Sequence, residues 1–206
     1  MRTTAEKRKA LWEDVMKHAI FEASVTVLKE HGPAGIRMDR VAKAADMATG
    51  TLYNYFKDKD ALLLHVIDTL FEPYHEEFQT IAEGDMSPKN KMDAYFRLTC
   101  RHLHEQGDII ALLVQEKVIG PEPEREKDRG VDYRIKIIRI LCKIIEEGIA
   151  TGAFRKCHIM ETAAMIFGAM NGFIDLKLIK QAPERTLEED FENCSALILP
   201  GILAGS

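Results

Sequence analysis

The sequence predicts an all-α protein with a small N-terminal domain and a larger C-terminal one. Apolar residues recur at steps of three and four along most of the chain, and the breaks in this pattern fall at glycine, proline or capping residues. The 206 residues include only 13 glycines and 7 prolines, which argues against a turn-rich all-β fold. We expect about nine helices, divided between a domain of residues 1–60 and a domain of residues 61–206.

The N-terminal domain is expected to contain one long helix and two short ones. The long helix should bury an apolar stripe that includes Leu11 and Val15, and it should end at Gly32, which is followed by proline. Two short helices follow, the second over about 49–56. Asp46 lies between them, where a tight turn needs a left-handed backbone that Asp tolerates better than most residues.

The C-terminal domain is expected to begin with a helix over about 59–82, for which Asp58 is the N-cap. Pro73 lies inside this segment and should bend or break the helix. Gly107 should separate the next two helices, and Pro200 should close the last one. The remaining helices are expected at about 88–105, 108–119, 135–149, 159–180 and 187–199.

The charge distribution and the cysteine content indicate the kind of environment in which the protein works. The net charge is −5, yet residues 1–60 hold 11 Lys and Arg against 9 Asp and Glu, whereas the rest holds 17 against 24. The four cysteines form no C-x-x-C pair, which suits a reducing cytoplasm. No uncharged apolar stretch approaches ~18 residues, and the N-terminus has no apolar signal core. We therefore expect a cytoplasmic protein with no membrane partner.

The second short helix has the composition of a helix that lies in the major groove of DNA. No Asp or Glu occurs from 47 to 57, and the outer positions carry Gly, Thr, Asn and Tyr. Leu52 and Phe56, four residues apart, are expected to anchor its inner face. Two short helices joined by a tight turn and braced by a longer helix form a helix-turn-helix, here over about 37–56. The alternative is that the aromatic cluster is simply core.

The surrounding sequence favours the DNA-binding interpretation. Ile20–Gly32, Met38–Ala45 and Thr49–Leu62 resemble, in order and spacing, the first helix, the second helix and the recognition helix of the TetR family. Gly152–Arg155, followed by small residues on the next helix, resembles the junction between that family's seventh and eighth helices. The resemblance implies a ligand-responsive repressor that binds a pseudo-palindromic operator as a homodimer.

Three positions depart from the family pattern. Arg37 stands where a capping Thr is usual, Asp46 where Gly is frequent, and Thr49 where a basic residue is common. The guanidinium of Arg37 could reach a phosphate instead of capping the helix. Asn54 is the expected reader of a base edge. The full set expected to contact DNA is Arg37, Thr49, Gly50, Thr51, Tyr53, Asn54, Tyr55, Lys57 and Lys59.

The resemblance also implies that the C-terminal domain binds a small, largely apolar effector and forms the dimer. Polar groups on otherwise apolar helices, such as Tyr95 and His102, are expected to orient the ligand. The expected pocket residues are Phe71, Phe78, Tyr95, Leu98, His102, Val114 and Tyr133. The expected dimer residues, on the last two helices, are Phe167, Gly168, Met170, Asn171, Gly172, Phe191, Cys194 and Ile198.

One rival interpretation comes from a different class of protein. Glu72 and His75 have the E-x-x-H spacing of carboxylate-bridged metal enzymes built on helical bundles. Such enzymes need two of these motifs, and this chain has one, interrupted by Pro73. We therefore expect no enzyme, no metal site and no cofactor. A second alternative keeps the same DNA-binding head but makes the protein an activator.

Overall fold

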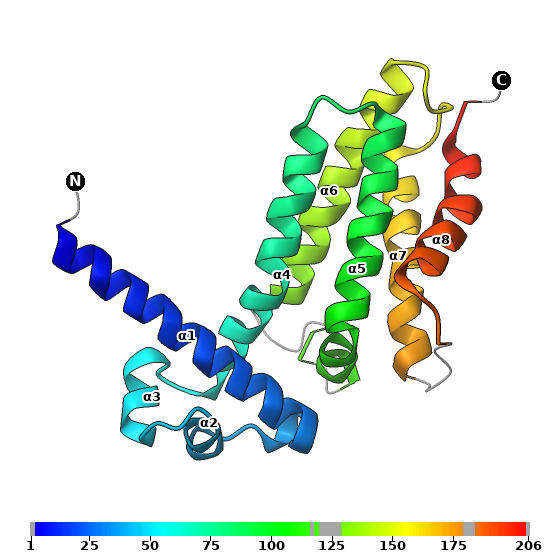
Figure 1. Ribbon diagram of the computed structural model, residues 1–206. Helices are drawn as coiled ribbons and strands as arrows, with labels where there is room; N and C mark the ends of the chain where they lie inside the picture. The colour runs from blue at the N-terminus through cyan, green and yellow to red at the C-terminus, as the bar shows by residue number, and fades with distance from the viewer. Residues whose placement is uncertain (1–2, 116–117, 120–128, 179–183, 205–206) are drawn as a thin grey trace. The chain divides into compact units, whose positions relative to one another are not determined.

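The computed structural model describes residues 3–115, 118–119, 129–178 and 184–204 (Figure 1). Those residues contain eight α-helices, one 3-10 turn and a single antiparallel bridge between Phe154 and Leu203, so the predicted all-α fold is confirmed. The chain divides into two compact units, Met1–Thr69 and Leu70–Ser206.

The first unit is built on one long helix and two short ones. Its elements are α1 (Thr4–His31), the 3-10 turn η1 (Pro33–Gly35), α2 (Met38–Ala44), α3 (Thr49–Tyr55) and the first turns of α4 (Lys59–Glu83). Thr3 and Glu6 cap the start of α1 reciprocally, and Gly32 ends it with a φ of 65°, as predicted. His65 of α4 stacks on Phe56 with ring centroids 4.9 Å apart and hydrogen-bonds through Nε2 to the carbonyl of Lys17 at 3.2 Å.

The apolar stripe of α1 is buried over less of its length than predicted. Burial begins at Ile20, whereas Leu11 is 65% exposed and Val15 is 53% exposed. The reason is length: α1 has 28 residues, or about 42 Å, and α2, which packs against it, has seven, or about 10 Å. The prediction that Leu11 and Val15 are core residues is wrong for this unit.

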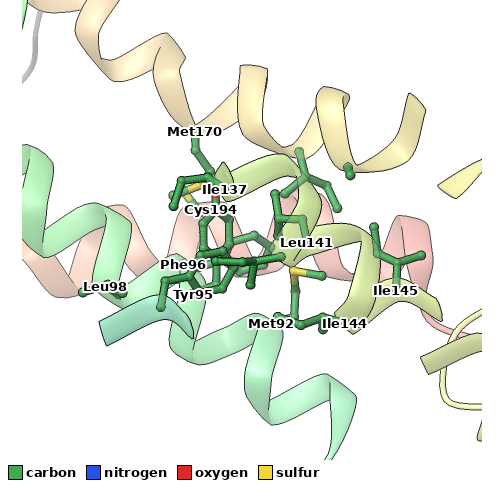
Figure 2. Close-up of a cluster of buried hydrophobic side chains, with 14 of the residues drawn as sticks. Met92, Tyr95, Phe96, Leu98, Ile137, Leu141, Ile144, Ile145, Met170 and Cys194 are labelled. Atoms are coloured by element: carbon green, nitrogen blue, oxygen red, sulfur yellow. The ribbon is translucent and has the colours of Figure 1, made fainter. Parts of the chain in front are cut away.

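The second unit is a helical bundle arranged around α5 (Pro88–Gln115). This helix contacts α6 (Arg129–Ala150), α7 (Ile159–Leu178) and α8 (Leu187–Ile202). Figure 2 shows the core that these helices share, in which Tyr95, Phe96 and Leu141 are fully buried.

Two predicted helix ends are wrong, and Pro73 does not break the helix that contains it. Helix α5 runs through Gly107, which is buried, so the two expected helices are one. Helix α4 continues past Pro73, and α8 continues past Pro200 to Ile202. A glycine or proline inside a helix costs about 1 or 3 kcal/mol, and the burial of the surrounding apolar faces outweighs that cost.

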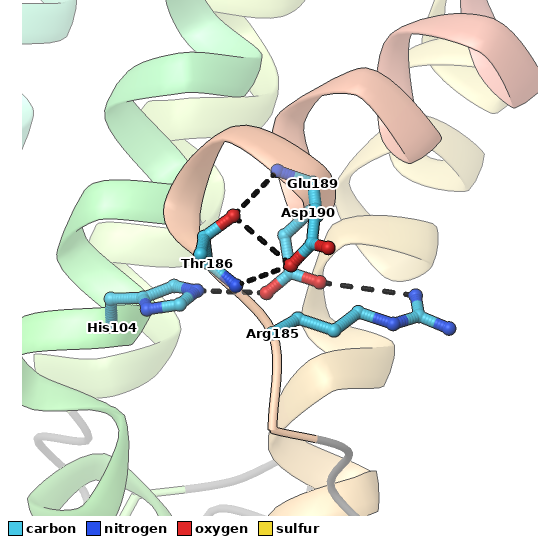
Figure 3. A network of polar contacts seen from close by, with 5 residues as sticks. All are labelled: His104, Arg185, Thr186, Glu189 and Asp190. Atoms are coloured by element: carbon cyan, nitrogen blue, oxygen red, sulfur yellow. Dashed lines mark hydrogen bonds and ion pairs between the residues drawn. The ribbon is translucent and has the colours of Figure 1, made fainter.

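Polar contacts fix the start of α8 against α5. Thr186 and Glu189 form a reciprocal cap on α8, and the next residue, Asp190, accepts a hydrogen bond from His104 Nε2 of α5 at 2.8 Å (Figure 3). Arg185 lies 3.9 Å from the other carboxylate oxygen of Asp190. These contacts hold α8 in register on the bundle.

Candidate functional site

Helix α3 is anchored through one face and presents the other to solvent. Leu52 is fully buried and Phe56, at its C-terminal end, is 7% exposed, as the four-residue spacing predicted. Tyr53 is 51% exposed, and Gly50 and Asn54 are exposed beside it. The expected DNA-contacting residues of α3 therefore include an exposed set that is free of acidic side chains.

The turn before α3 sets its angle to α2. Asp46 adopts a φ of 52°, the left-handed conformation predicted for it, and is the sole non-glycine with positive φ in the described residues. The next amide, that of Met47, donates to the carbonyl of Ala42 at 2.9 Å. This turn lets two seven-residue helices follow each other closely, which is the geometry a helix-turn-helix needs.

The basic residues that flank α3 lie at the surface. Arg37 precedes α2 and makes no capping hydrogen bond; its guanidinium instead donates to both carboxylate oxygens of Asp39, each at 3.1 Å. Lys57 is exposed and lies 3.7 Å from Asp58. Asp58 accepts the amide of Ala61 at 2.8 Å, the capping bond expected at the start of α4.

Thr49, Thr51, Tyr55 and Lys59 are half-buried rather than exposed. Gly50 faces open space, since a Cβ added there would meet no atom within 4 Å. The surface of α3 thus carries no side chain at Gly50 and hydrogen-bonding side chains beside it, so that a nucleic-acid backbone could approach closely.

A second candidate site is an aromatic cluster in the second unit. His102 of α5 lies against Phe71 and Tyr74 of α4, with ring centroids 5.7 and 4.7 Å away. Phe71 also stacks on Tyr133 of α6 at 5.5 Å. The structure therefore brings together three of the residues expected to form the pocket and adds Tyr74, which sequence reasoning missed.

Polar atoms of this cluster are buried without complete hydrogen bonding. The Tyr74 hydroxyl bonds to the Thr99 hydroxyl at 2.9 Å. In contrast, the Tyr95 hydroxyl and His102 Nε2 are buried, and no hydrogen bond of regular geometry reaches either atom in the described parts of the chain, although Thr99 and Tyr74 lie near enough to shift the pKa of Tyr95. Thr99, also missed from sequence, lies four residues after Tyr95 and accordingly on the same face of α5.

Burial shifts the pKa of each of these groups further in favour of its uncharged form. It lowers the pKa of His102 to about 4, with the positive charge of Arg101 acting in the same direction. Burial also raises the pKa of Tyr74 to about 12 and that of Tyr95 well above its ordinary value.

The other expected pocket residues are less clearly grouped. Phe78 is fully buried and contacts Tyr95, with ring centroids 4.5 Å apart. Leu98 is buried on α5, and Val114 is half-buried near the end of that helix.

The residues that suggested a metal enzyme have other contacts. Glu72 accepts a hydrogen bond from the Tyr133 hydroxyl, and His75 lies edge-on to the Tyr133 ring at 6.4 Å. Across the described ranges, no three His, Cys, Asp or Glu side chains are grouped as a metal ion would require.

The outer faces of α7 and α8 are unusually apolar. Met165 of α7 is 74% exposed and Leu197 of α8 is 72% exposed. An added Cβ at Gly168 or Gly172 meets no atom within 4 Å, so α7 offers a smooth strip there. In the described chain, Ile159–Leu176 of α7 alone is long and apolar enough to cross a membrane, and 22% of it is buried.

The residues expected in a dimer interface divide between two faces of these helices. Met170 and Cys194 are buried in the core of their own unit. Gly168 is exposed, and five others are half-buried: Phe167, Asn171, Gly172, Phe191 and Ile198. Phe191 is covered by the guanidinium of Arg97, 3.8 Å from its ring centroid.

Comparisons with known families match both units. Residues 20–66 match the model of bacterial regulatory proteins of the tetR family, and residues 123–194 match the tetracyclin repressor-like C-terminal domain. Together these matches cover more than half of the chain.

Individual proteins give the same result. The chain is 29% identical over 161 residues to the HTH-type transcriptional regulator YhgD of Bacillus subtilis, covering 71% of this chain and 76% of YhgD. It is 21% identical over 139 residues to the HTH-type transcriptional repressor KstR2 of Mycolicibacterium smegmatis, covering 66% of each. Its fold resembles that of FadR of Bacillus subtilis in complex with stearoyl-CoA, with a TM-score of 0.72, 22% identity, and coverage of 90% and 98% of the two chains.

Proposed function

The chain belongs to the TetR family of DNA-binding transcriptional regulators. We propose that it is a repressor that binds a pseudo-palindromic operator as a homodimer. The repressor releases the operator when a small, largely apolar effector binds. We assign DNA binding to the first unit, and effector binding and dimerisation to the second. The observation that carries the proposal is the exposed, acid-free face of α3 on a helix-turn-helix.

The proposed DNA contacts divide into two kinds. Hydroxyl and ammonium groups of Tyr53 and Lys59, with Arg37 and Lys57, bind phosphates, and these contacts are independent of sequence. Asn54, exposed near the C-terminal end of α3, reads a base edge, with adenine the best match for its amide. Gly50 lets the start of α3 approach the bases closely.

A gel-shift series with the DNA upstream of the protein's own gene tests this assignment. We expect Asn54→Ala to reduce binding to that DNA roughly tenfold, and to change which bases are preferred, because a bidentate base contact contributes about 1–3 kcal/mol. Asn90→Ala, which changes an exposed Asn at the start of α5, is the matched control and should bind like the wild type. An unchanged base preference in Asn54→Ala would remove Asn54 from the reading surface.

Phosphate contacts have a different signature. Tyr53→Ala and Lys59→Ala should weaken binding to specific and random duplexes alike. The Lys59 substitution should also make the affinity less sensitive to salt, because each neutralised phosphate releases a counterion. A loss confined to one DNA sequence would contradict the phosphate role.

We propose that the outer faces of α7 and α8 pack against the same faces of a second copy. Exposed Met165 and Leu197, together with the open strip at Gly168, form an apolar surface that a twofold-related copy could bury. A dimer also suits an operator with two half-sites ~34–36 Å apart. The proposed interface does not include Met170 and Cys194, which the sequence placed there, because both are buried in the core of their own unit.

Sedimentation velocity tests the interface. Met165→Glu places a charge in the proposed apolar contact and should shift the protein toward monomer at micromolar concentration. Met86→Glu, at a 40% exposed methionine between α4 and α5, is the matched control and should remain dimeric. Dimers of undiminished stability in Met165→Glu would move the interface elsewhere.

The proposed effector site is the aromatic cluster of Phe71, Tyr74, His102 and Tyr133. Its rings provide apolar surface, and its incompletely bonded polar atoms provide orientation. FadR, the structural relative, was solved with stearoyl-CoA, so acyl compounds are the first effectors to test. An effector should raise the melting temperature and release operator DNA at the same concentrations.

A further inference from the structure

The buried polar atoms of the second unit indicate what kind of group an effector places there. This inference rests on the proposed ligand-responsive function and goes beyond it to the chemical class of the ligand. The Tyr95 side chain is fully buried, and its hydroxyl finds no hydrogen-bond partner among the described residues. His102 Nε2 is in the same situation two helical turns along α5. A buried polar atom left in this state costs about 1–3 kcal/mol, so a ligand group that satisfies it gains affinity.

The surroundings of these atoms are aromatic rather than ionic. His102 lies against Phe71 and Tyr74, and Tyr95 lies against Phe78. Between the two orphaned atoms, Thr99 and Tyr74 hydrogen-bond to each other, so neither of these hydroxyls is short of a partner. A ligand group that enters here therefore meets one N–H or O–H at a time, surrounded by aromatic rings.

Two cations beside the cluster, Arg101 and Lys136, already have partners. Arg101, next to His102 in sequence, donates to the carboxylate of Glu77. Lys136 lies over the ring of Tyr133, with Nζ 4.6 Å from the centroid. On the same side Glu72 accepts from the Tyr133 hydroxyl, which adds negative charge. A ligand carboxylate buried beside His102 would lose its hydration, and the counterion available there is an imidazolium that must be formed against the burial that lowers the pKa of His102, which is a large cost.

We propose that the effector carries an uncharged hydrogen-bonding group, such as the carbonyl of an ester, thioester or amide, that binds at His102 or Tyr95, and that a free carboxylate is excluded from this site. The Tyr95 hydroxyl can donate to such a carbonyl, and so can Nε2 of the neutral imidazole. The apolar part of the effector packs on the surrounding rings. Discrimination between an acid and its ester follows from the cost of forming a charged pair in this buried site, not from the shape of the site.

Calorimetric titration of the full chain with four matched probes tests this selectivity: decanoic acid, methyl decanoate, decanamide and decane. Near neutral pH, the ester and the amide should bind roughly tenfold or more tightly than the acid. His102→Phe or Tyr95→Phe keeps the ring and removes the polar atom, and at least one of them should weaken ester binding roughly two- to tenfold while leaving decane binding unchanged. His158→Phe, at an exposed histidine before α7, is the control and should behave like the wild type.

The outcomes separate this inference from the function it rests on. If the acid binds as tightly as the ester, or if both single variants keep the full preference for the ester, the inference is overturned while ligand responsiveness stands. If none of the four probes binds the wild type or releases DNA from it, the inference and the proposed response to apolar effectors both fail. The comparison of probes on the wild type does not depend on the folding of any variant.

Discussion

Removing a hydroxyl group from Tyr95 or from Tyr74 should change stability in opposite directions. Both substitutions, Tyr95→Phe and Tyr74→Phe, delete one oxygen from a buried ring in the same unit. The Tyr95 hydroxyl meets no partner in the described residues, whereas the Tyr74 hydroxyl bonds to Thr99 at 2.9 Å. The pair thus compares a buried polar atom that is unsatisfied with one that is satisfied.

The expected sizes follow from those contacts. An unsatisfied buried hydroxyl costs about 1–3 kcal/mol, so Tyr95→Phe should raise the free energy of unfolding by about 1 kcal/mol or more. Tyr74→Phe loses a hydrogen bond and should lower the free energy of unfolding by about 0.5–1.5 kcal/mol. For a chain of this length, 1 kcal/mol corresponds to about 2–4 °C in Tm.

Thermal and urea unfolding of the two variants beside the wild type measure the difference. We expect Tyr95→Phe to melt above the wild type and Tyr74→Phe below it, with equal m-values. Phe at position 95 keeps the ring contacts with Phe78, so packing should change little. A Tyr95→Phe variant that is less stable than the wild type would show that the hydroxyl is satisfied in solution, and would refute the argument.

Three further predictions test other parts of the structure. The free energy of unfolding should fall by roughly 3 kcal/mol as the pH drops from 6.5 to 4, because His102 is protonated in the unfolded chain over this range but stays neutral in the folded chain down to its pKa of about 4. His102→Phe should remove this part of the pH dependence, and an unaltered dependence would contradict the prediction. Asp46→Gly should stabilise the first unit by about 1 kcal/mol in urea unfolding, since it relieves a φ of 52°, and a loss of stability would contradict the turn geometry. Gly148→Ala should cost about 1–3 kcal/mol in the same assay, because its Cβ would lie 2.0 Å from Phe154, and an unchanged stability would contradict that packing.

Local features of the fold were predictable because they depend on a few neighbouring residues. The left-handed turn at Asp46, the end of α1 at Gly32 and the Asp58 cap all follow from backbone and side-chain preferences over short distances. Gly107 and Pro200 were misinterpreted as helix ends because their local preference is outweighed by packing from distant helices. Sequence alone does not show that packing.

The sites show a related limit. Periodicity identifies residues on one helix face but does not reveal which face is turned inward when both are apolar. Met170 and Cys194 were expected at the surface for this reason, whereas Met165 and Leu197 are exposed. The signal for Tyr74 was present, since it lies three residues after Phe71 on the same helix, but its role depends on His102 of α5, a contact across the bundle.

The central claim is that the exposed face of α3 makes this protein a specific DNA-binding regulator. The most direct test is the ratio of two dissociation constants for the purified wild type at physiological salt, one for random duplex and one for the best site in the DNA upstream of its own gene. We predict that the specific site binds roughly a thousandfold or more tightly, and that the bound protein is a dimer. A ratio close to one would contradict the claim.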